Sequence, residues 1–173
     1  MEKNVINQEE LISKVNNIFV KLLSSVMLNN LETLKHFISE DVYSRYNNII
    51  HEDINNNVRH MYEQLNVFKS NIVDFYEDDT NVVVIVNITA RYYDYYVNLN
   101  TGKYISGNKN TRMVVDYHIV MKKKKDVNEL EKVRRCPNCG NPLDVNNNGK
   151  CPYCYSIFNQ EDYDWILSDI SAS

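Results

Sequence analysis

Apolar residues recur at helical spacing through the first third of the chain. From Asn7 to Met27 they return every three or four positions, which predicts an amphipathic helix with Asn7 as its N-cap. The same spacing predicts a shorter helix over residues 31–39 and a third helical segment over residues 41–65. Three consecutive asparagines at 55–57 can break this last segment, because asparagine side chains compete for backbone hydrogen bonds.

After residue 65 the pattern changes to segments that are rich in Val, Ile, Tyr and Phe. These segments predict β-strands over residues 67–76, 82–97, 111–122 and 163–170. Turn residues separate the first three strands, at 77–81 and 98–103, and Gly102 falls at a hairpin tip. The predicted fold class is therefore α+β, with three N-terminal helices packed on a four-stranded antiparallel sheet.

All four cysteines of the 173-residue chain lie in the segment CPNCGNPLDVNNNGKCPYC. They are Cys136, Cys139, Cys151 and Cys154. Each CxxC turn can present two thiolates to one ion, and two such turns separated by eleven residues predict a zinc ribbon. Because four thiolates fill a tetrahedral coordination sphere, we expect one structural zinc ion per chain and no open position for catalysis.

The residues around the cysteines also suit tight turns. Pro137 and Pro152 stiffen the two turns, and Gly140 supplies the positive φ that the first turn needs. Tyr155 stands where a second glycine is expected, so it should strain or reshape the second turn without removing a ligand.

Two disulfides, or an iron site of the rubredoxin type, are the alternatives to zinc. The first residues, MEKNVINQEE, are charged and polar and do not read as a signal peptide, so we expect a reducing cytoplasm, where disulfides are rare. Iron uses similar paired turns, and metal analysis would distinguish it from zinc. The chain shows no flavin or second-metal motif that would serve a redox centre.

The stretch YDWILSDIS follows the cysteines and again has the composition of a strand. The predicted ribbon, residues 134–160, is thus an insertion before the last strand of a main domain formed by residues 1–133 and 161–173. We expect Trp165 to lie in the core of that domain with Leu167.

Net charge and local charge point in different directions. The net charge of −4 argues against wholesale nucleic-acid binding, and no apolar run approaches the length of a membrane-spanning helix. A basic cluster nevertheless precedes the ribbon: Lys122, Lys123, Lys124, Lys125, Lys132, Arg134 and Arg135. One interpretation is a solvated strand end that blocks edge pairing. The other is a docking patch for anionic phospholipid headgroups or, less favoured, for nucleic acid.

Three amphipathic helices before a long antiparallel sheet resemble the cone-shaped fold of the nuclear transport factor 2-like superfamily. More narrowly, the chain resembles bacterial relatives of the C-terminal domain of mitochondrial inner-membrane translocase subunit 44, over about residues 8–172. The residues that carry this are VVVIVNITARYYDYYVNLNTGKYISGNKNTRMVVDYHIVMKKK, the two knuckles and DWILSDI. The resemblance implies a curved sheet, a non-enzymatic role in protein transport or at a membrane, and proteins or anionic membranes as partners. The protein would then be cytoplasmic or peripheral at the inner face of the membrane.

A small-molecule enzyme of the same fold is the alternative function. Tyr92, Asp94 and Tyr96 share one side of their strand and could line the mouth of the cone, while Asp116 and His118 share one side of the next strand. Together these groups could form an acid/base pair, or they could be packed tyrosines and a surface Asp/His pair. The remaining histidines are expected to be solvent-exposed helix residues: His36, His51 and His60.

Overall fold

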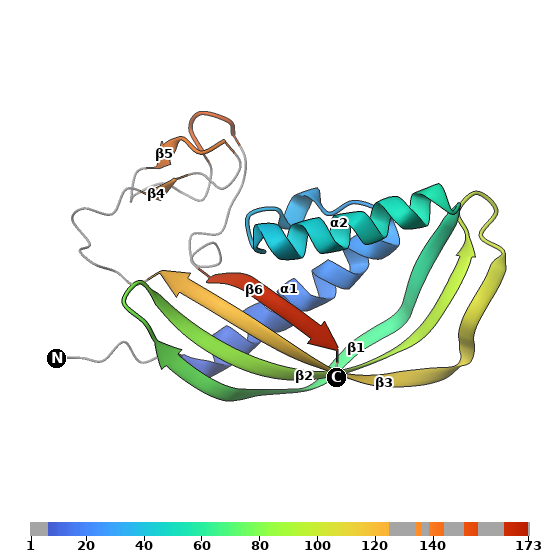
Figure 1. The fold of residues 1–173 in the computed structure, drawn as a ribbon, viewed down its shortest axis with the longest axis horizontal. Helices are drawn as coiled ribbons and strands as arrows, with labels where there is room; N and C mark the ends of the chain where they lie inside the picture. The colour runs from blue at the N-terminus through green and yellow to red at the C-terminus, as the bar shows by residue number, and fades with distance from the viewer. Residues whose placement is uncertain (1–6, 125–133, 136–138, 144–150, 156–164, 173) are drawn as a thin grey trace.

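The computed structural model describes residues 7–124, 134–135, 139–143, 151–155 and 165–172. Two helices lie on one face of a strongly curved sheet, and a small two-stranded sheet precedes the last strand (Figure 1). The main sheet is antiparallel, with strand order β1-β2-β3-β6. In chain order the elements are α1 (Gln8–Leu28), the 3₁₀ turn η1 (Glu32–Leu34), α2 (Glu40–Asn55), β1 (Val58–Glu77), β2 (Asn81–Asn98), β3 (Tyr104–Lys124), β4 (Arg134–Arg135), β5 (Pro142–Leu143) and β6 (Trp165–Ala172).

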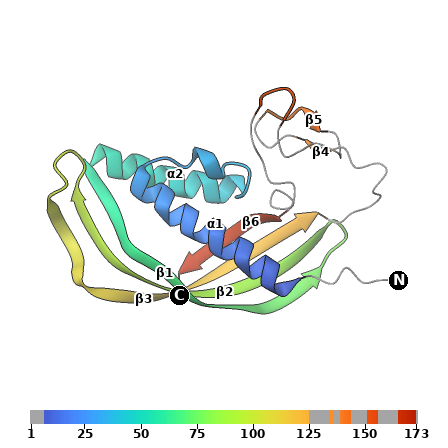
Figure 2. The ribbon, with the colours of Figure 1, turned by 180° about the vertical axis from the view of Figure 1, so that it is seen from behind.

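Helix α1 crosses the concave face of the main sheet (Figure 2). The Asn7 side chain caps it by accepting a hydrogen bond of 3.2 Å from the backbone N–H of Glu10, as predicted. Eight of its residues are buried. By length and composition alone α1 could also cross a membrane, but that test is weak for a helix whose apolar side chains are buried in a core.

The prediction of a second helix over residues 31–39 is wrong for most of that range. Only the turn η1 is helical between α1 and α2. Beyond it, Phe37 and Ser39 bond to the backbone of Leu167 at the edge of β6, with N–O distances of 2.9 and 3.0 Å. These residues satisfy their backbone groups by pairing with a strand, so the helix has no need to continue.

The predicted third helix stops at Asn55, ten residues before the end that its apolar spacing suggested. Asn57 takes a left-handed conformation, with φ of 57°, and the chain reverses there into β1. The asparagine run therefore breaks the helix. His60, predicted on an exposed helix, lies instead on β1, and His36 is half-buried in the turn after η1, whereas His51 is exposed on α2 as predicted.

The sheet bends sharply at one level, where all three long strands carry irregularities. The register shifts between Glu63 and Asn66 in β1 and between Tyr92 and Asp94 in β2, opposite residues 109–112 of β3. Beyond the bend, Gly107 has φ of 102°, and an added Cβ would lie 2.5 Å from the Cα of Tyr95. Glycine is needed there so that the two strands can approach each other.

Three strands extend the predicted ones or match them closely. Strand β2 exceeds its predicted range by one residue at each end, while β1 begins nine residues early and β3 seven residues early. The described last strand begins at Trp165, since the first two residues of the predicted strand lie outside the described part of the chain.

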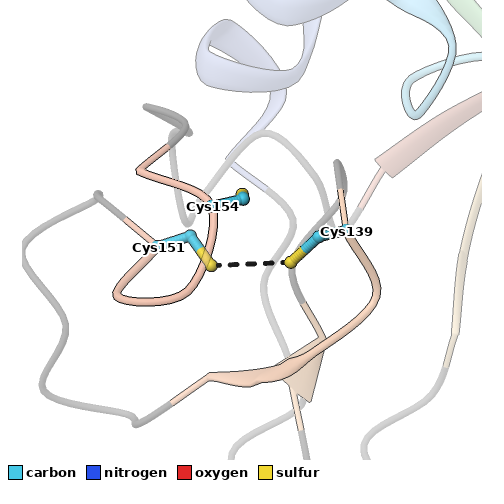
Figure 3. Close-up of side chains that lie close together, drawn as sticks. All are labelled: Cys139, Cys151 and Cys154. Carbon is cyan, nitrogen blue, oxygen red and sulfur yellow. Dashed lines mark hydrogen bonds between the residues drawn. The ribbon is translucent and has the colours of Figure 1, made fainter.

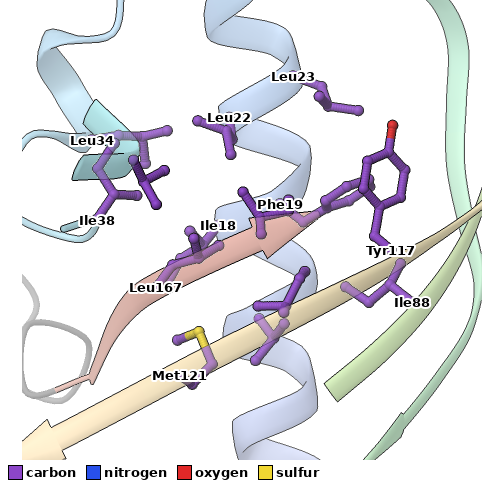
Figure 4. Packing of buried hydrophobic residues seen from close by; sticks show 14 of the residues in the cluster. Ile18, Phe19, Leu22, Leu23, Leu34, Ile38, Ile88, Tyr117, Met121 and Leu167 are labelled. Carbon is purple, nitrogen blue, oxygen red and sulfur yellow. The ribbon is translucent and has the colours of Figure 1, made fainter. Parts of the chain in front are cut away.

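The core lies between α1, the segment around η1 and the concave face of the sheet (Figure 4). Phe19 is fully buried and meets the ring of Tyr117 edge-on, with 4.8 Å between ring centroids. Trp165 is 7% exposed and belongs to the same cluster as Leu167, so its predicted core position is confirmed. Arg45 of α2 also bonds to Asp169 of β6, which ties this helix to the edge of the sheet.

Candidate metal centre and the concave-face cluster

Three cysteine thiols converge in the small two-stranded region (Figure 3). The sulfur atoms of Cys139, Cys151 and Cys154 all lie within 4.8 Å of one another, and those of Cys139 and Cys151 are 3.7 Å apart. A disulfide needs about 2.05 Å. Tetrahedral Zn–S bonds of about 2.3 Å place two ligands about 3.8 Å apart. The spacing therefore suits a shared metal ion; Cys136, the predicted fourth ligand, lies outside the described residues.

Backbone geometry positions these thiols. Strands β4 and β5 pair antiparallel on either side of the first knuckle. In that knuckle the Asn141 amide donates to the sulfur of Cys139 at 3.4 Å, and Gly140 has the expected positive φ of 77°. In the second knuckle the backbone N–H of Tyr153 donates to the sulfur of Cys151 at 3.4 Å. Donors aimed at sulfur stabilise thiolates, the form that binds metal.

Tyr155 occupies the position in the second knuckle that Gly140 occupies in the first. Its φ is 62°, and its backbone N–H bonds to the carbonyl of Cys151 at 2.9 Å. The turn thus keeps its shape, and the backbone of Tyr155 takes a conformation that disfavours a side chain by about 1–2 kcal/mol.

A second group of polar side chains lies on the concave face near the bend. His60 of β1 donates from Nε2 to Asp94 Oδ1 of β2 at 2.5 Å. Its ring is stacked between Tyr62 and Tyr96, with centroids 4.1 and 4.4 Å away. The His60 side chain is 12% exposed and that of Asp94 is 29% exposed. We call His60, Tyr62, Asp94 and Tyr96 the concave-face cluster.

Buried tyrosines connect this cluster to the core. Tyr62 meets Tyr92 edge-on at 5.1 Å, and the hydroxyls of Tyr92 and Tyr117 share a hydrogen bond of 2.7 Å. Burial raises the pKa of Tyr62 and of Tyr117, and the neighbouring tyrosines and the bond to Tyr92 add to the rise. These hydroxyls therefore stay protonated at physiological pH and act as hydrogen-bonding groups within the packing.

The structure does not bring the five predicted pocket residues together. Tyr92, Asp94 and Tyr96 lie on the concave side, but Asp116 and His118 are exposed on either side of the inward-facing Tyr117. They point to the convex face, because side chains alternate along a strand. There Asp116 accepts a 2.6 Å bond from Thr89, and His118 lies 3.1 Å from the Asn87 side chain.

Sequence reasoning missed His60 and Tyr62. The missed signal was the alternation of His60 and Tyr62 along a strand, which the helical interpretation of this segment concealed.

The described part of the basic cluster stands beside acidic residues. Lys122 and Lys124 are exposed at the end of β3, whereas the ammonium group of Lys123 lies 5.8 Å above the ring of Trp165. The pKa of Asp78, in the adjoining β1–β2 hairpin, is lowered mainly by backbone hydrogen bonds and further by Lys122. Lys125 and Lys132 lie outside the described residues, and Arg134 and Arg135 form β4.

Comparison with known proteins relates most of the main domain to one family. The family described as "Tim44-like domain" matches residues 2–132, which include both helices and the first three strands. The match ends before Cys136. A search among curated proteins found no match. Among solved structures, the crystal structure of the intermembrane space region of chloroplast protein ARC6 aligns over 93% of this chain and 95% of that chain, with 8% identity and a TM-score of 0.48.

Proposed function

Because this chain belongs to the Tim44-like domain family, we propose that it is a non-enzymatic binding or scaffold module that serves protein transport or acts at a membrane. The position of Asp116 and His118 carries the non-enzymatic part of the proposal. General acid/base chemistry needs its groups within hydrogen-bonding reach of one substrate. The two residues face away from Tyr92 and Asp94, across the sheet, so the four groups cannot act on one substrate.

We propose one structural zinc ion in the inserted segment. The 3.7 Å sulfur separation supports it, and Cys136 would supply the fourth thiolate. Four thiolates would complete the coordination sphere, so the ion would order residues 134–160 and take no part in a reaction. The main domain, residues 1–133 and 161–173, would then carry the binding function.

A protein is the partner that the surface favours. Strand β1 is one of the two edge strands of the main sheet, and large apolar side chains on it are exposed by 43–50%. They are Phe68, Val73, Phe75 and Tyr76. Exposed apolar residues on an edge strand suit a partner that contributes apolar contacts or a further strand.

An anionic membrane is the second candidate partner, favoured by the exposed Lys122 and Lys124. Each cation near an anionic surface contributes about 1 kcal/mol. The acidic hairpin beside them weakens that attraction, and together with the net charge of −4 it makes nucleic acid the least favoured partner. We further propose that the protein is cytoplasmic, either free in solution or peripheral at the inner face of the membrane.

Two exposed valines give a matched test of the partner surface. Val73 on β1 is 50% exposed and Val114 on β3 is 62% exposed, so lysine can replace either without loss of core packing. Crosslinked co-purification from native cells should recover one protein with the wild type and with Val114→Lys, and lose it with Val73→Lys. Equal recovery with both variants would exclude the β1 surface.

The same preparations separate the other partner classes. Sedimentation with vesicles that contain phosphatidylglycerol, at low and at moderate salt, would reveal membrane binding if no protein partner is recovered. Turnover of a metabolite pool that is lost in Asp116→Ala would overturn the non-enzymatic proposal.

A further inference from the structure

An unsatisfied carboxylate lies beside the concave-face cluster. Asp53 of α2 is only 7% exposed, and its Oδ2 atom is buried without a hydrogen-bond partner. Leaving a buried carboxylate oxygen unpaired is costly, so such groups in proteins are normally paired with a donor or a cation. Among the described residues, no Lys or Arg forms an ion pair with Asp53.

The surroundings of Asp53 are negative and aromatic. Burial raises the pKa of Asp53, His60 opposes the rise and Glu52 adds to it. The pKa of Tyr96 is raised by burial and then by three carboxylates, those of Asp53, Asp94 and Glu52. Three acidic groups therefore act on one tyrosine, while the ring of the nearby His60 is already hydrogen-bonded to Asp94. This place attracts a positive charge that the described residues do not supply.

The geometry decides between a metal ion and an organic cation. A metal ion needs several ligand atoms around one point. Of the described residues, only the cysteines bring three ligand atoms within 4.8 Å of one another, so Asp53, His60 and Asp94 do not converge on one ion. An organic cation can instead donate N–H groups to separated carboxylates while it lies against an aromatic ring.

We propose that Asp53, Asp94 and Tyr96 form a binding site for an alkylammonium or guanidinium group. Asp53 supplies the buried acceptor, Asp94 supplies a second carboxylate that is partly exposed, and Tyr96 supplies a half-buried ring. The cation comes either from a free amine or from a lysine or arginine side chain of another protein. The site is formed by residues of α2 and β2 and stands whether or not the exposed apolar residues of β1 bind a partner.

The test is an NMR titration of the metal-loaded full chain. The probes are n-butylammonium and n-butylguanidinium chloride, with sodium chloride at matched ionic strength as the reference. The proposal expects saturable amide shifts near residues 52–53 and 94–96. Shifts that grow linearly with the probe, or that sodium chloride reproduces, would overturn it.

Two isosteric variants complete the experiment. Asp53→Asn should weaken probe binding at least about tenfold, because it removes a charge-assisted acceptor. Asp116→Asn removes an exposed carboxylate on the convex face and should bind like the wild type. If Asp53→Asn and Asp116→Asn bound the probes with equal affinity, the assignment of the site to Asp53 would be overturned. If Asp53→Asn fails to fold, Asp94→Asn serves as an independent variant with the same expected loss of binding. A lysine-containing tripeptide that binds more tightly than n-butylammonium would identify a protein side chain as the source, and equal or weaker binding a free amine.

Discussion

The main domain and the inserted cysteine segment differ in what holds them together. In the main domain, α1 buries eight of its residues against a sheet that also buries Val86, Ile88 and Ile119 completely. In the described part of the inserted segment, the regular structure is a pair of two-residue strands, and the thiols meet at a single point. One region is stabilised by apolar burial, whereas we propose that a bound ion holds the other together, so the two should fail independently.

Loss of a metal ligand should produce the largest effect. Cys151 is completely buried among the three thiols, so Cys151→Ser should abolish metal binding. In isolated finger peptides a structural zinc contributes roughly 10–16 kcal/mol of apparent binding free energy, coupled to folding. Metal analysis should fall from one zinc per chain to none. Circular dichroism should show that the main domain still melts as in the wild type. Loss of metal binding together with unfolding of the main domain would contradict the independence of the two regions.

Truncation of Trp165 should destabilise the main domain and leave metal binding unchanged. Trp165→Ala removes a large buried ring from the core of the main domain, at a typical cost of roughly 3–5 kcal/mol. The free energy of unfolding, measured in urea, should fall by that amount while the zinc content stays at one. Ile166 is 37% exposed on the same strand, so Ile166→Ala is the matched control and should change little. A Trp165→Ala protein as stable as the control would show that the ring is not part of the core.

Relief of the backbone strain at Tyr155 should have a smaller effect, which is a gain in the stability of the inserted segment. Tyr155→Gly places glycine at φ of 62°, as Gly140 already stands at φ of 77°. The inserted segment should be stabilised by about 1 kcal/mol and should hold its metal about fivefold more tightly against a competing chelator. The converse substitution, Gly140→Tyr, should weaken metal retention. Weaker metal retention in Tyr155→Gly would show that the tyrosine side chain stabilises the inserted segment by more than the strained backbone conformation destabilises it.

The smallest effect concerns Asp53 and depends on pH. The pKa of this carboxyl is raised by burial in the folded state, so the folded protein loses stability as pH rises from the unfolded pKa of about 3.9 through the folded value. Asp53→Asn should therefore stabilise the ligand-free protein at pH 7 by at most about 1 kcal/mol, the scale of one unmade hydrogen bond. The gain should vanish at pH 3. A gain that is independent of pH would exclude the charge as its cause.

The regular parts of the fold could be predicted because their patterns are local. The Val and Ile run of β2 lies between clear turn signals, and its predicted bounds differ from the observed ones by a single residue at each end. Trp165 could be placed because a large aromatic on a short apolar strand has few alternatives to the core.

The segment from Val58 to Leu65 could not be assigned in the same way. Its apolar residues are spaced three or four apart, and the irregularity after Glu63 in β1 breaks the alternation that would identify a strand. The contacts of His60 with Asp94 and Tyr96 depend on the pairing of β1 with β2, which no local pattern specifies. Alternation along one strand relates the faces of its own residues, but no local pattern relates the faces of two strands, and Asp116 and His118 lie on the exposed side of β3.

Hydrogen exchange after zinc removal tests the difference between the two regions most directly. The full chain would be treated with a chelator, and amide exchange would be compared with that of the metal-loaded protein by mass spectrometry. Exchange should rise across residues 134–160 and stay unchanged in α1 and in β1 to β3. Exchange that rises throughout β6 and the core strands would contradict the account, because it would make the metal integral to the whole fold.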